Sequence, residues 1–168
     1  GNAPFIVFED ADIDAAVAGA LISKYRNSGQ TCVCTNRILV QESIHDAFVA
    51  KLVAATADLK LGNGLEDGVQ QGPLVNAGAV QDVDKLVQLS VTAGAQVALG
   101  GARSELGPCY YQPTVLTAVT PDMAVFRNEI FGPVAPVMSF TDEAEAISLA
   151  NDTEFGLASY FYTRDIGR

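Results

Sequence analysis

Residues 4–41, PFIVFEDADIDAAVAGALISKYRNSGQTCVCTNRILVQ, decide the fold class of this chain. The stretch opens with a short apolar run, Pro4 to Phe8, that is typical of a buried strand. Asp12 can then cap a helix. Apolar residues recur along that helix at a spacing of four: Ile13, Val17, Leu21 and Tyr25. Arg37 to Gln41 reads as a second strand, so the stretch is a strand–helix–strand unit of the kind that builds parallel sheets.

The rest of the chain continues this alternation. Ser43 to Asp46 resembles a capping box, and an apolar face follows it: Ile44, Phe48, Leu52, Ala55 and Leu59. A third helix ending near Gly94 is indicated by a valine stripe: Val80, Val83, Val87 and Val91. β-rich segments follow at 96–99, 113–119, 134–140 and 158–162, with a short helix at 141–151. We therefore predict an α/β fold with a mainly parallel sheet flanked by helices.

Composition narrows the function classes. At 168 residues, with 49% hydrophobic and 18% charged residues, the chain is about one packed globular domain. A net charge of -10 argues against nucleic acid as a partner, because phosphate binding needs a basic surface. No apolar run approaches the ~20 residues of a membrane span. Three cysteines, Cys32, Cys34 and Cys109, do not form an even disulfide framework, so we expect a reducing cytoplasm and no membrane partner.

Residues 24–34 (KYRNSGQTCVC) place Cys32 in a loop just beyond the expected helix, six residues after Arg26. A thiol near a fixed positive charge and free backbone N–H groups ionises readily, and the thiolate is the nucleophile. The alternative is that Cys32 is only a buried small hydrophobe. His45 is the single histidine, and its place in the first turn of an expected helix indicates a surface residue rather than a catalytic base.

No metal or phosphate site is indicated by the pattern. Cys32 and Cys34 lack the spacing of zinc ligands, and His45 is remote from them. Neither G-x-G-x-x-G nor a P-loop occurs. A thiol without a histidine partner needs activation by local electrostatics or by a carboxylate base elsewhere.

Four short stretches together resemble one protein family. Residues 29–32 (GQTC) resemble the cysteine signature of the aldehyde dehydrogenase superfamily, and residues 128–134 (NEIFGPV) resemble its second signature. Residues 1–4 (GNAP) are similar to the tail of its Glu-Leu-Gly-Gly motif, and residues 151–157 (NDTEFGL) also match. The resemblance implies that 1–168 is an incomplete catalytic domain, with a dinucleotide-binding domain before it and a C-terminal segment after it.

The resemblance also implies a reaction. Cys32 attacks an aldehyde, its backbone N–H stabilises the oxyanion, and hydride passes to NAD or NADP, leaving a thioester that water hydrolyses. Glu129 is expected to bind the ribose hydroxyls of the cofactor and Phe131 to pack by the nicotinamide ring. The alternatives are a helix-start carboxylate and a core phenylalanine. The general base would lie three residues before Gly1, so the 168 residues alone are expected to be inactive.

Within the family, residues 24–34 look most like succinate-semialdehyde dehydrogenases. Arg26 would then hold the substrate carboxylate, since a guanidinium can clamp a carboxylate through two hydrogen bonds. The alternative is that Arg26 pairs with the helix C-terminus. The resemblance further implies a homo-oligomer and a possible redox partner for Cys32 in Cys34, which is otherwise a packed bystander.

Other functions stay open at this point. The substrate could be another carboxylated aldehyde such as glutarate semialdehyde. A protein of another class, a truncated relic or interaction module that kept the scaffold, is the non-catalytic alternative. The choice between NAD and NADP does not follow from these residues.

Overall fold

A six-stranded sheet in the order β3-β4-β5-β2-β1-β6 forms the middle of the molecule. The computed structural model describes residues 1–168. The strands are β1 (Ala3–Val7), β2 (Thr35–Gln41), β3 (Gln96–Leu99), β4 (Thr114–Thr117), β5 (Val134–Phe140) and β6 (Tyr160–Tyr162). All neighbouring pairs are parallel except β3 with β4. The predicted α/β fold with a mainly parallel sheet is confirmed.

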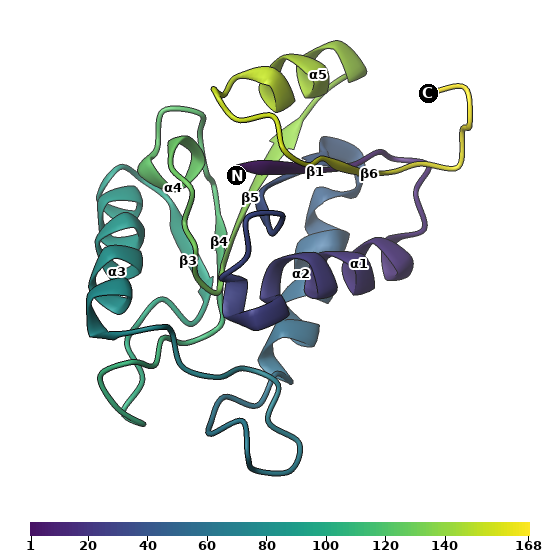
Figure 1. Ribbon diagram of the computed structural model, residues 1–168. Helices are drawn as coiled ribbons and strands as arrows, with labels where there is room; N and C mark the ends of the chain where they lie inside the picture. The colour runs from purple at the N-terminus through teal and green to yellow at the C-terminus, as the bar shows by residue number, and fades with distance from the viewer.

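Helices cover both faces of this sheet (Figure 1). The helices are α1 (Ile13–Tyr25), α2 (His45–Ala57), α3 (Ala77–Thr92), α4 (Ala124–Arg127) and α5 (Glu143–Asn151). Two 3₁₀ turns, Arg26–Gly29 and Glu42–Ile44, follow α1 and β2. One buried core lies under α1 and α2 and the other under α3, α4 and α5. None of these helices has both the length and the apolar character needed to cross a membrane.

The helix starts show where local sequence signals work. Asp12 caps α1 as predicted, since its carboxylate accepts the Ala15 N–H at 3.1 Å. The capping box predicted at Ser43 is wrong: α2 begins at His45 after a 3₁₀ turn, with no side-chain cap. His45 is not a fully exposed surface residue either. Its side chain is 20% exposed, and its Nδ1 lies 3.0 Å from Asp46 Oδ1.

The buried face of α1 differs from the predicted apolar stripe. Its buried residues are Ala16, Val17, Ala20, Lys24 and Tyr25. Small side chains on this face let the helix lie close to the sheet, and a Cβ on Gly19 would fall 1.9 Å from the Tyr162 hydroxyl oxygen of β6. Ile13 and Leu21 therefore pack only partly against the core. Close approach, rather than a row of large apolar residues, fixes α1 on the sheet.

Candidate active site

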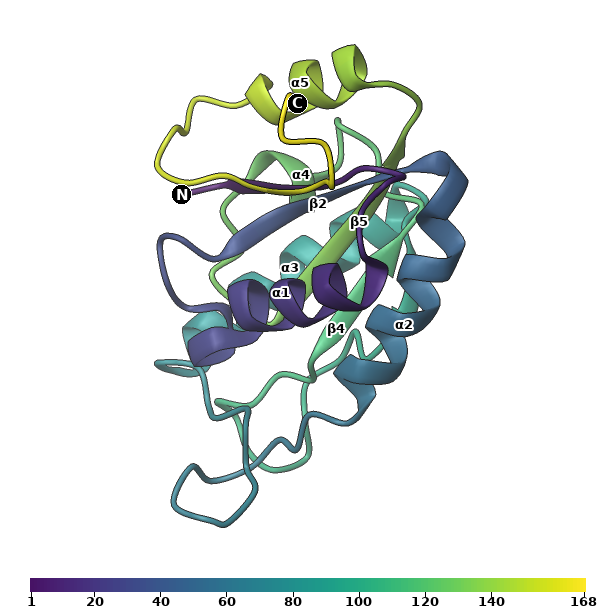
Figure 2. The same ribbon diagram turned by 90° about the vertical axis from the view of Figure 1, so that its right-hand side faces the viewer.

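The predicted site residues gather at the amino ends of the parallel strands. Figure 2 shows the start of β1, the loop before β2 and the segment before β6 on the same side of the molecule. The segments involved are residues 1–2, 26–34, 128–133 and 157–159, each of which precedes a strand. Because β1, β2, β5 and β6 run in parallel, segments that are distant in sequence meet at one edge of the sheet.

The loop that carries Cys32, residues 26–34, is here called the cysteine loop. It leaves α1 through a left-handed turn, in which Asn27 has φ 50° and Ser28 φ 54°. Gly29 continues the turn with φ 77°, a conformation that glycine adopts without a steric penalty. A Cβ on Gly29 would also lie 2.0 Å from the carbonyl oxygen of Gly132. The two sequence motifs therefore meet by backbone contact.

A neighbouring segment holds the left-handed turn in place. The Ser28 hydroxyl donates to the Gly72 carbonyl at 3.1 Å and accepts the Gly72 N–H at 3.2 Å. The Gln30 carboxamide donates to the Asn27 carbonyl at 3.1 Å and accepts the Val75 N–H at 2.9 Å. These bonds satisfy backbone groups that a non-helical turn leaves unpaired.

Cys32 lies at the tip of the cysteine loop. The Cys34 N–H donates to the Thr31 carbonyl at 3.0 Å, which closes a tight turn around Cys32 and Val33. Cys32 is exposed, and its backbone N–H makes no hydrogen bond within the chain. Cys34 is buried, with its Sγ 2.7 Å from the Thr31 hydroxyl oxygen. Both thiols are free, and they face different environments.

Arg26 begins the cysteine loop and is exposed. Its carbonyl accepts from the Cys34 thiol at 3.7 Å, while its guanidinium makes no ion pair or hydrogen bond within the chain. The predicted alternative, pairing with the end of α1, is therefore not seen. An exposed guanidinium with no partner is available to an anion.

Glu129 and Phe131 both lie beside the cysteine loop. Glu129 follows α4, which ends at Arg127, so it is not a helix-start carboxylate. Its side chain is 31% exposed and lies against the backbone nitrogen of Gly1. Phe131 has φ 52° and is 44% exposed, so it is not a core residue. A bulky residue at positive φ is strained, and such strain is concentrated at functional sites.

This donor set fits a nicotinamide cofactor. A partly exposed carboxylate can accept hydrogen bonds from ribose hydroxyls, and an exposed aromatic face can pack on a planar ring. Gly1 lies between the two halves of the site, since a Cβ on Gly1 would fall 2.3 Å from the Cys32 carbonyl oxygen. Cys32 and Glu129 are thus neighbours of the same residue.

Comparison with known proteins identifies the family of this chain. The whole chain, residues 1–168, matches the Aldehyde dehydrogenase family. The chain belongs to this family. It is 59% identical to a glutarate-semialdehyde dehydrogenase of Pseudomonas aeruginosa and 56% identical to a 3-sulfolactaldehyde dehydrogenase of Pseudomonas putida, each over 168 residues. It covers all of its own length and 35% of each relative.

The structural likeness is equally close. The crystal structure of succinate-semialdehyde dehydrogenase from Burkholderia pseudomallei matches with a TM-score of 0.98 at 57% identity. The match covers 99% of this chain and 35% of that one. This aldehyde dehydrogenase chain therefore spans about a third of the length of the relatives it matches.

Asn36 is a site residue that the sequence did not single out. It lies at the start of β2 and is 2% exposed. Its Nδ2 donates to the Asn128 carbonyl at 2.8 Å, and its Oδ1 accepts the Ile130 N–H at 3.1 Å. The sequence offers one signal for this role. Asn36 is an amide directly before an apolar strand segment, and an amide buried at such a place must find hydrogen-bond partners.

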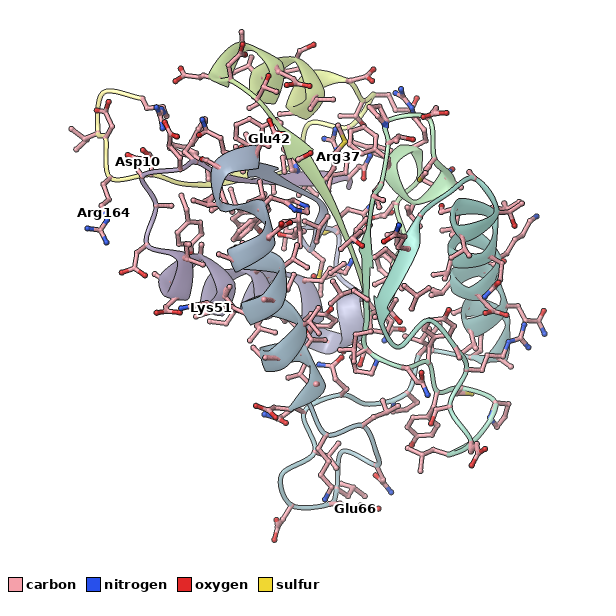
Figure 3. All side chains as sticks on the ribbon, turned by 180° about the vertical axis from the view of Figure 1, so that it is seen from behind. Asp10, Arg37, Glu42, Lys51, Glu66 and Arg164 are labelled. Atoms are coloured by element: carbon pink, nitrogen blue, oxygen red, sulfur yellow. The ribbon has the colours of Figure 1, made fainter.

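Arg37, the next residue, ties α5 to the sheet of this aldehyde dehydrogenase chain. It is labelled beneath α5 in Figure 3. Its Nη1 and Nη2 donate to the carbonyls of Leu149 and Ala150 at 2.8 and 2.9 Å, and its Nε donates to the Asn2 carbonyl at 3.0 Å. Burial lowers the pKa of Arg37 to about 10. The guanidinium therefore caps the end of α5 and fixes the start of β1.

Lys24 lies in the last turn of α1, where a cation usually points into solvent near the negative end of the helix dipole. It is instead 1% exposed, and its Nζ has no hydrogen-bond partner. Burial lowers the pKa of the Lys24 ammonium to about 8, and attraction to Cys34 and Glu129 offsets part of this shift. A cation without a partner thus lies beneath the site.

Proposed function

We propose that this chain supplies the nucleophile, the substrate anchor and part of the cofactor site for NAD- or NADP-dependent oxidation of an aldehyde that carries a distal anionic group. Succinic semialdehyde is the substrate we favour, and glutarate semialdehyde is the alternative. The observation that carries the proposal is the cysteine loop itself. It presents the exposed Cys32 with a free N–H, six residues after the unpaired guanidinium of Arg26.

The chemistry begins at Cys32. Its thiolate attacks the aldehyde carbon, the C–S bond forms, and the carbonyl electron pair moves onto oxygen. The Cys32 N–H is free to donate to that oxyanion, and one such donor typically contributes ~3–4 kcal/mol to the transition state. No rearrangement of backbone hydrogen bonds is needed to make this donor available.

Two side chains would hold the cofactor. Glu129 would bind ribose hydroxyls, and Phe131, held at φ 52°, would present its ring to the nicotinamide. The cofactor, when bound, supplies the acceptor for the hydride. Cys32 then carries a thioester, which water hydrolyses to the acid and the free thiol.

The base for that hydrolysis is not assigned to a residue of this chain. The family resemblance implies a glutamate three residues before Gly1. The activity is therefore proposed for the longer protein, and the 168 residues alone are expected not to reduce NAD or NADP.

The names of the relatives support an anionic substrate. Glutarate and succinate semialdehydes each carry a carboxylate, and 3-sulfolactaldehyde carries a sulfonate. Their shared chemistry is an aldehyde with an anion at the far end. Arg26 has the charge and the freedom to bind such an anion, because a guanidinium forms paired hydrogen bonds with planar oxyanions.

The test compares charged and uncharged aldehydes in the full-length protein. Arg26→Ala should lower kcat/KM for succinic semialdehyde by roughly 10- to 100-fold, because a hydrogen bond to a charged group contributes ~1.5–3 kcal/mol. The kcat/KM for butanal, which has no anionic group, should not change. Arg26→Lys should recover part of the loss. An unchanged preference rules out the clamp, and Cys32→Ser protein that still forms NADH or NADPH rules out the nucleophile.

A further inference from the structure

The Asn36 carboxamide binds the backbone on both sides of Glu129. It donates to the Asn128 carbonyl at 2.8 Å and accepts the Ile130 N–H at 3.1 Å. The two partner residues flank Glu129 directly, so the amide spans the residue that carries the carboxylate. Asn36 is separated from Ile130 by 94 residues in sequence, and this contact exists only in the folded molecule.

The same amide also reaches the start of β1. Asn36 Nδ2 lies 2.5 Å from Asn2 Oδ1, and Asn2 Nδ2 donates to the Phe126 carbonyl at 3.1 Å. Asn2 follows Gly1, whose α-carbon lies against the Cys32 carbonyl. Asn36 itself lies four residues after Cys32. One buried amide therefore links the nucleophile to the segment that carries Glu129.

We propose that Asn36 is a positioning residue that fixes the place of Glu129 relative to Cys32. The inference rests on the proposed function, in which Glu129 holds the cofactor ribose. The ribose is bonded covalently to the nicotinamide, so a displaced carboxylate shifts the ribose and with it the hydride acceptor. Hydride transfer depends steeply on the alignment of the reacting atoms.

The residue type is specified by this arrangement. The site needs two donor hydrogens, for the carbonyl of Asn128 and the Oδ1 of Asn2, and one acceptor, for the N–H of Ile130. Asparagine supplies all three from a single short side chain. Aspartate keeps the acceptor but turns a second oxygen toward a carbonyl, and an apolar residue leaves both backbone groups unpaired in a buried site.

The experiment uses Asn36→Asp and Asn36→Ser in the full-length protein. We expect the Kd for NAD or NADP, whichever the protein uses, to rise roughly tenfold, the equivalent of about one lost hydrogen bond. The KM for the semialdehyde should stay within about twofold. With semialdehyde deuterated at the aldehyde carbon, a larger isotope effect on kcat is expected, because a misplaced acceptor slows hydride transfer.

A double-mutant cycle with Glu129→Gln separates this role from general destabilisation. If Asn36 acts through Glu129, the two effects on cofactor Kd are not additive. Thr114→Val is the matched control, since Thr114 is buried on β4 and its hydroxyl bonds Gln112 and Gly101 at 2.7 and 2.8 Å. It should lose stability without a change in cofactor Kd.

Each outcome decides one of the two proposals. If Glu129→Gln weakens cofactor binding and both Asn36 variants leave it unchanged, the inference about Asn36 is wrong and the proposed function stands. If Glu129→Gln itself has no effect, the proposed cofactor site is wrong. Should neither Asn36 variant fold, hydrogen exchange at the Ile130 amide of the unaltered protein provides the test. Slow exchange that slows further with cofactor supports the inference, and unprotected exchange overturns it.

Discussion

Gly29 and Gly132 hold the cysteine loop and the NEIFGPV segment together by backbone contact, because a Cβ on Gly29 would lie 2.0 Å from the Gly132 carbonyl oxygen. Gly132 has a close contact of its own, since a Cβ there would lie 2.5 Å from a Val83 methyl on α3. The two motifs are therefore positioned by α3 and the main chain, with no side chain between them.

Gly29→Ala should damage the protein more than its positive φ alone explains. Gly68 is the matched control, because it has φ 78° and nothing within 4 Å of an added Cβ. We expect Gly68→Ala to cost ~1–2 kcal/mol of unfolding free energy, the usual cost of left-handed backbone. Gly29→Ala should cost clearly more unfolding free energy than Gly68→Ala. It should also slow the reaction of Cys32 with an alkylating reagent or with an aldehyde. Urea unfolding measures both variants, and equal costs would contradict the role of the Gly132 contact.

Lys24 should make stability depend on alkaline pH. Its pKa is lowered from 10.5 in the unfolded chain to about 8 in the folded protein. Between these values the unfolded chain holds one more proton, so raising the pH favours the folded state. The shift corresponds to a penalty of roughly 3 kcal/mol at pH 7 that disappears as pH rises from about 8 to 10.5. Lys24→Met should therefore be more stable than the unaltered protein at neutral pH.

The measurement for Lys24 is the difference in unfolding free energy between Lys24→Met and the unaltered protein at several pH values. The difference should shrink toward zero by about pH 10.5. Other titrating groups are present in both proteins, so their contributions cancel in the difference. Lys51→Met is the control, because Lys51 is half exposed and pairs with Asp14 at the surface. A pH-independent difference would show that Lys24 is not a buried ammonium.

Arg37 should be irreplaceable by lysine. Arg37→Met leaves the carbonyls of Asn2, Leu149 and Ala150 without their donor, and we expect a loss of roughly 3 kcal/mol. Arg37→Lys keeps the charge but cannot reach three carbonyls with a planar fork, so it should recover less than half of that loss. Hydrogen exchange at the end of α5 should speed up in both variants. Full recovery by lysine would mean that charge, not geometry, holds α5.

Cys34 is proposed as the redox partner of Cys32. Hydrogen peroxide would convert the Cys32 thiolate to a sulfenic acid, and attack by the Cys34 thiol would form a disulfide and release water. Cys34 faces inward against Thr31, so the cysteine loop must rearrange first. We expect the peptide containing both cysteines to lose two hydrogens and activity to return with a thiol reductant. Cys34→Ser protein should be inactivated without recovery, and an unchanged peptide mass would end the proposal.

Sequence reasoning succeeded where signals are local. Val80, Val83 and Val87 of the predicted stripe are buried in α3, and its fourth member, Val91, is partly buried. The strand predicted at 134–140 has those bounds in the structure. It failed where contacts between residues distant in sequence determine the position of a side chain. Asn36 meets Ile130 across 94 residues, and Lys24 is buried only because α1 ends against the site.

The left-handed turn was missed for a related reason. Glycine commonly ends a helix, which would place the end of α1 at Gly29. The helix instead ends at Tyr25, and two non-glycine residues, Asn27 and Ser28, also adopt positive φ. Such residues hold this conformation only when their surroundings enforce it, here through Gly72 and Val75. Nothing in the sequence of residues 26–29 alone indicates that distant residues stabilise this turn.

The candidate site lies at the amino ends of the strands, so residue changes at the two ends of the sheet should differ in their effect on the site. Open α/β sheets usually bind ligands at the carboxyl ends of their strands. Here the connections at those ends, residues 8–12, 42–44 and 141–142, lie away from Cys32 and Glu129. We therefore expect insertions and surface substitutions in these connections to leave the side chains of Cys32 and Glu129 in place.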